Sequence, residues 1–205
     1  MRKQGKLLFG IAGLGLAAVA SPTAGSPITW EFAGELTLVR DDDGSLGGVF
    51  GVGTLFSGMF TFESTTPDSS PVNLGFGNYE GALTSVSGRV GEVPFLERPG
   101  LPGSITVFDN FGGDGFSVSA ATEFLGAPVR FGMTFGDSTN SIFSDDSLPL
   151  TPPDLSSLDS TVFFLALEPD GDLLRGELTQ LTPDPGTLVL LLVGGSFVVR
   201  RDQCL

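Results

Sequence analysis

The middle of the chain alternates between apolar and polar positions with a period of two, which predicts β-strands. The alternation is cleanest in 128–135, where Val129, Phe131, Met133 and Phe135 fall on one face. In seven further segments, apolar or alternating runs are bounded by residues that favour turns. These segments are 28–39, 50–63, 79–90, 104–108, 116–122, 161–167 and 173–181.

The segments between these runs are rich in Gly, Pro, Asp and Asn, and none has the period of a helix. Two of the segments, 94–103 and 144–159, are long connections. We expect hairpins to join 104–108 to 116–122 and 161–167 to 173–181. The sequence therefore predicts an all-β domain of about eight strands, folded as a two-layer antiparallel β-sandwich that is jelly-roll-like, with an open barrel as the alternative.

Aromatic composition favours a packed core over a sugar-binding platform. The chain has 18 phenylalanines but one tryptophan, Trp30, and one tyrosine, Tyr79. Sugar-binding surfaces use Trp and Tyr, and both residues here lie within predicted strands. We therefore expect both to pack within the domain.

The first twenty residues have the composition of a secretory signal peptide. Arg2, Lys3 and Lys6 form a basic start, and an apolar segment follows up to a small-x-small site at Ala18 and Ala20. This order predicts export and cleavage after Ala20. A retained N-terminal anchor is the alternative.

Residues 182–205 have three parts in a fixed order. Pro183, Asp184, Pro185 and Gly186 form a turn, the thirteen residues 187–199 are an apolar run, and Arg200 and Arg201 follow. As a helix, the run would be about 20 Å long, which is short against a bilayer core of about 30 Å. The arginine pair is typical of a cytoplasmic stop.

This tail resembles the PEP-CTERM sorting signal of bacterial exosortase substrates. In that family, a Pro-Glu-Pro motif precedes a short transmembrane segment and a basic end. This chain has Asp184 in place of the Glu, and Asp202 to Leu205 follow the arginines. The resemblance implies transient residence in the inner membrane, processing by an exosortase-like membrane protease or transpeptidase, and delivery to the cell surface or extracellular matrix. An unprocessed tail anchor is the alternative.

The predicted ectodomain, residues 21–181, is strongly acidic. It has 22 acidic residues against five arginines, a net charge of −17, and it has no lysine. This charge repels phosphate backbones and argues against a nucleic-acid partner. The only cysteine is Cys204, so we expect the ectodomain to fold without a disulfide.

The composition also excludes several kinds of active site. The chain has no histidine, so it cannot form a Ser-His-Asp triad or an imidazole metal site. Without cysteine or lysine in the ectodomain, thiol nucleophiles and Schiff bases are excluded as well. Paired carboxylates remain, but no pair stands out. We expect a non-catalytic protein.

Three acidic turns offer the hard oxygen ligands that Ca²⁺ takes. The metal-ligand candidates are Asp41 and Asp43 in the first turn and Asp109 and Asp114 in the second, while the third turn is 170–172. No EF-hand loop is present, and ordinary turn formation explains the same residues. No other cofactor is expected. The sequence thus favours an exported, non-catalytic surface or matrix protein, with a Ca²⁺- or carbohydrate-binding module, for instance for exopolysaccharide, as the alternative.

Overall fold

The computed structural model describes residues 27–73, 75–109, 112–167 and 171–184, which form nine antiparallel strands and one short 3₁₀-helix. No helix of this part of the chain has the length and apolar character needed to span a membrane. The predicted signal peptide and the apolar run 187–199 lie outside the described residues. The elements are β1 (Pro27–Arg40), β2 (Leu55–Glu63), β3 (Phe76–Val90), β4 (Val93–Glu97), β5 (Gly103–Phe108), β6 (Asp114–Phe124), β7 (Ala127–Asp137), η1 (Leu155–Ser157), β8 (Ser160–Leu167) and β9 (Leu173–Pro183).

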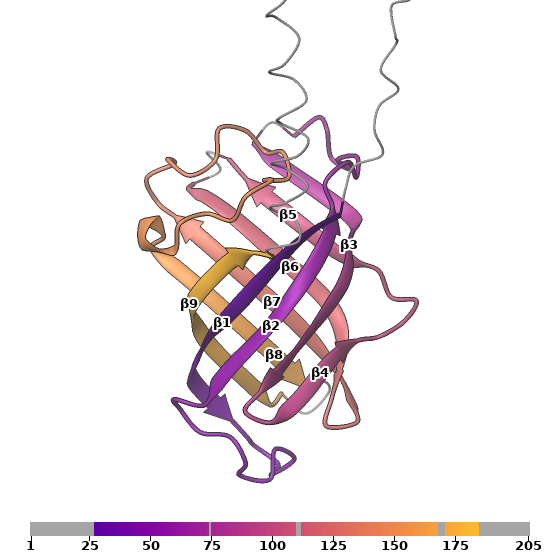
Figure 1. The fold of residues 1–205 in the computed structure, drawn as a ribbon, viewed down its shortest axis with the longest axis vertical. Coiled ribbons are helices and arrows are strands. Elements are labelled where there is room, and N and C mark those ends of the chain that lie inside the picture. Colours follow the sequence, from indigo (N-terminus) through magenta and orange to yellow (C-terminus); the bar gives the residue numbers. More distant parts are fainter. Residues whose placement is uncertain (1–26, 74, 110–111, 168–170, 185–205) are drawn as a thin grey trace, which may run out of the picture.

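The strands close into one barrel (Figure 1). Strands that follow one another in the sequence pair with each other, and β4 and β5 are the one exception among the described strands. Instead, both lie between β3 and β6 and share one position in the ring. Pairing of β9 with β1 completes the circle, so the barrel has eight strand positions.

The predicted two-layer sandwich is therefore wrong, although the all-β class is confirmed. A sandwich needs edge strands, and here both edges of every ring position are paired. The sequence pattern could not reveal this, because inward and outward residues alternate in the same way in a sandwich and in a barrel. The connection predicted over 94–103 also contains most of a strand, β4, which the composition did not reveal because the segment has three prolines and two glycines.

The interior of the barrel is filled with aromatic rings. Phe56 and Phe163 stack with centroids 4.0 Å apart, and Phe131 packs edge-on against Phe163. Trp30 is fully buried, as expected, and contacts Phe60 and Phe62. Its Nε1 has no hydrogen-bond partner, the one such buried side-chain atom in the described residues.

Glycines on the inner wall make room for these rings. A Cβ at Gly34 would lie 2.4 Å from Cζ of Phe56, and one at Gly58 would lie 2.6 Å from Cζ of Phe32. A Cβ at Gly88 would likewise lie 2.4 Å from Cζ of Phe95. The interior of an eight-stranded barrel is just wide enough for its side chains to fill it or for one small ligand. Phe32, Phe56 and Phe95 therefore each lie beside a wall position without a side chain.

Loops close both ends of the barrel (Figure 1). At the lower end, the loop after β1 inserts Leu46 and Phe50, and Phe50 packs on Phe124 with centroids 5.5 Å apart. At the upper end, the loop between β7 and β8 inserts Leu148. The barrel is thus a packed core and not a container.

The fit of ring to glycine gives a first prediction. Gly34→Ala should lower the free energy of unfolding by about 3 kcal/mol, because its Cβ would also lie 2.1 Å from the backbone oxygen of Glu177. The matched control is Gly51→Ala, whose Cβ meets nothing within 4 Å. Urea unfolding measures both, and equal stability of the two variants would contradict the packing account.

Candidate functional site

The aspartates of the described residues gather in loops and at strand ends, and three of them are buried. Asp114, Asp137 and Asp172 each expose 3% or less of their surface. A buried carboxylate is costly unless hydrogen bonds satisfy it. Each of the three accepts hydrogen bonds from the loop that closes its end of the barrel, so these aspartates hold the closing loops in place.

At the lower end, Asp172 holds the loop that follows β1. Its Oδ1 accepts from the backbone N–H of Asp42 at 2.7 Å, and its Oδ2 accepts from Oγ of Ser45 at 2.6 Å. These bonds, the Ser45 hydroxyl first, hold the pKa of Asp172 below its usual value. The guanidinium of Arg40 places a positive charge at this end of the barrel. It donates to the carbonyl of Gly171 and lies 3.5 Å from the carboxylate of Asp42.

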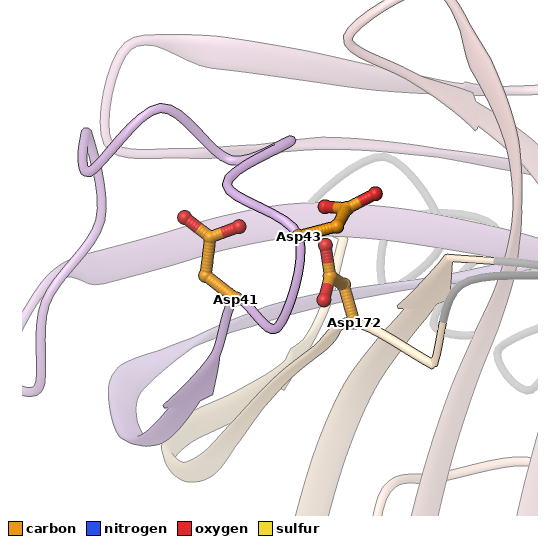
Figure 2. Close-up of side chains that lie close together, drawn as sticks. All are labelled: Asp41, Asp43 and Asp172. Atoms are coloured by element: carbon orange, nitrogen blue, oxygen red, sulfur yellow. The ribbon is translucent and has the colours of Figure 1, made fainter.

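Three carboxylates converge at this end (Figure 2). Asp41 and Asp43 come from the loop after β1, and Asp172 comes from the turn before β9. One oxygen from each lies within 4.8 Å of the other two. Hard oxygen ligands at such spacing suit Ca²⁺. Each carboxylate also accepts a hydrogen bond from within the loop, from Leu46 for Asp41 and from Ser45 for Asp43.

The structure brings together one of the two predicted pairs of metal ligands. Asp41 and Asp43 belong to the cluster, and Asp172 from the third acidic turn joins them. The carboxylate of Asp114 instead accepts from the backbone N–H groups of Ile142 and Phe143, at 2.8 and 2.9 Å. Asp109 donates its own backbone N–H to Gly75. Neither residue belongs to a group of three possible metal ligands in the described part of the chain.

The upper end has a second carboxylate that the sequence reasoning missed. Asp137 accepts from the hydroxyl and the N–H of Thr139 and from Ser141, and these bonds lower its pKa from 3.8 to about 2. Asp159 accepts from the hydroxyl and N–H of Ser138, which lowers its pKa as well. Asp137 ends β7 and starts a loop, and this position at a strand end was the available signal.

Tyr79 ties the same loop to β3. Its hydroxyl donates to the backbone oxygen of Asp146 at 2.7 Å. Burial, followed by the charges of Asp68, Asp146 and Asp145, raises the pKa of Tyr79 to about 12. This side chain is therefore a neutral donor at physiological pH and packs as the sequence predicted.

The two ends of the described chain lie side by side at the upper end of the barrel (Figure 1). Trp30 pairs with Pro183, and the N–H of Asp184 donates to the oxygen of Thr29 at 2.9 Å. The strand β9 therefore continues two residues past the predicted limit at Leu181. The first proline of the motif is the last residue of the barrel, and the remainder, Pro185 and Gly186, lies outside the described residues.

Comparison with protein-family models, curated proteins and solved structures gave no match. Function must therefore be argued from the chain itself.

Proposed function

We propose that this chain is an exported, non-catalytic protein of the cell surface or extracellular matrix, sorted by an exosortase-like membrane enzyme. The observation that carries the proposal is the position of the chain ends. Pro27 and Asp184 leave the barrel at the same end, so a signal peptide and a sorting tail would both attach there. The loop that contains Asp41 and Asp43 lies at the opposite end and would face away from the membrane.

The filled interior supports a non-catalytic role. Ligands and substrates usually occupy apolar cavities, and in small barrels such cavities lie in the barrel mouth. Here rings occupy the interior, and Phe50 and Leu148 are among the residues that close its ends. A structural or surface-binding role uses the outer wall and the loops.

The geometry also makes cleavage within the motif compatible with a stable fold. β9 ends at Pro183, and Asp184 is the last residue bonded to β1. A cut after Pro185 or Gly186 would leave every strand of the barrel complete. The apolar run would then be removed without exposing a barrel edge.

The proposal predicts that the mature protein in its native host ends near Pro185 or Gly186, as measured by mass spectrometry. Pro185→Ala should leave the barrel folded, because the residue follows the last strand, and should make the precursor accumulate in the membrane fraction. The matched control is Pro71→Ala, an exposed loop proline, which should be processed normally. Recovery of the intact tail from a host with a working exosortase would count against the proposal.

The second candidate function is Ca²⁺ binding at the lower end of the barrel. The convergence of Asp41, Asp43 and Asp172 favours calcium binding, since Asp172 is remote from the other two in the sequence and is brought to them by the fold. The hydrogen bonds to Ser45 and Leu46 give the cluster a second explanation, which is to hold the loop in place. The two explanations differ in their response to calcium.

Thermal unfolding of the full-length protein in detergent separates them. A calcium site predicts a midpoint that rises with CaCl₂ and saturates, with about 2.7 kcal/mol of stabilisation at a hundred times the dissociation constant. Asp43→Asn should abolish this rise, whereas Glu123→Gln, which removes an exposed charge outside the cluster, should keep it. If CaCl₂ acts like NaCl at matched ionic strength, the effect is charge screening and calcium binding is ruled out.

A further inference from the structure

The barrel wall is interrupted at one level, where β4 gives way to β5. β4 pairs with residues 122–124 of β6, and β5 pairs with residues 115–119. Between them, 120–121 of β6 face the connection 98–102 instead of a strand. The N–H of Arg98 bridges the break, to the oxygen of Ala121 at 3.0 Å. An open groove of about 470 Å³ lies at this break, within the size range of small-ligand sites.

The lining of this groove differs from the rest of the surface. No acidic residue lines it, although acidic residues outnumber arginines 22 to five in residues 21–181. Two of those five arginines, Arg98 and Arg130, are in the lining. The lining also has the hydroxyls of Ser104 and Ser119 and the ring of Pro102.

Both arginines are available to a ligand. In the described part of the chain the one ion pair is between Arg40 and Asp42, so neither Arg98 nor Arg130 is neutralised by a carboxylate. The guanidinium of Arg130 lies 5.8 Å from the ring centroid of Phe164, which supports it from one side. A guanidinium has five donors in a planar fork that matches a carboxylate.

We propose that this groove binds the carboxylate of a uronic-acid-containing saccharide. Arg98 and Arg130 would hold the carboxylate, Ser104 and Ser119 would exchange hydrogen bonds with sugar hydroxyls, and the ring of Pro102 would pack on an apolar sugar face. The choice of a saccharide rests on the proposed surface or matrix function. The selectivity for a carboxylate rests on the groove alone.

The surrounding charge strengthens this selectivity. The acidic loops at the barrel ends repel polyanions in general, so a carboxylated ligand would be admitted only where two arginines lie together without an acidic neighbour in the lining. A neutral sugar would lack the charge-assisted pairing with the arginines and would bind more weakly.

The test is calorimetric titration of the full-length protein in nonionic detergent with a glucuronic acid trisaccharide. Its carboxyl-reduced neutral counterpart and hexaglutamate are the comparison ligands. We expect binding of the acidic trisaccharide alone. Arg98→Ala and Arg130→Gln should each weaken it about tenfold or more, since each removes charged hydrogen bonds.

The matched control is Arg89→Ala, which removes one exposed arginine on β3 outside the groove and should leave binding unchanged. Unfolding midpoints equal to wild type show that the groove variants remain folded. Absence of binding, equal binding of the neutral sugar or of hexaglutamate, or an equal loss in Arg89→Ala would each overturn the proposal. Sorting is measured separately through the mature C-terminus, so failure of one proposal is distinguishable from failure of the other.

Discussion

The constraint on which the structure depends is the fixed width of an eight-stranded barrel. The interior must be filled by side chains from the strands themselves, and this chain fills it with phenylalanine. The rings of Phe56, Phe32 and Phe95 fit because their cross-strand partners on the neighbouring strand, Gly34, Gly58 and Gly88, have no side chain. The rings and the glycines beside them are therefore two parts of one packing solution.

The same constraint explains the acidic ends. Long loops cover the two ends of the filled barrel, and they insert apolar side chains such as Leu46, Phe50 and Leu148. Buried aspartates also hold these loops, with Asp172 at the lower end and Asp114 and Asp137 at the upper end. Hydrogen bonds to backbone N–H groups favour the charged carboxylate and repay its burial. Loop closure thus explains these three carboxylates of the acidic domain.

Much of the strand content could be predicted from the sequence, but the closure of the sheet could not. The alternation in Val129, Phe131, Met133 and Phe135 correctly gave one buried face. Which strand pairs with which depends on contacts such as Trp30 with Pro183, which are remote in sequence. β4 was missed because its proline-containing segment has the composition of a loop.

The candidate sites show the same division. Asp41 and Asp43 could be proposed from their turn, because neighbouring residues share a loop. The position of Asp172 beside them could not be predicted, because it depends on the pairing of β9 with β1. The groove between Arg98 and Arg130 depends on the break between β4 and β5, and the sequence has no pattern that marks that break.

Hydrogen exchange tests barrel closure most directly. Residue-resolved amide exchange of the native protein reports whether any strand has an unpaired edge. The account predicts slow exchange on both sides of every ring position, including the amides that join β1 to β9 and β2 to β3, with rapid exchange at Gly100 in the connection between β4 and β5. Fast exchange at every second amide along one whole strand would show a free edge and would contradict the closed barrel.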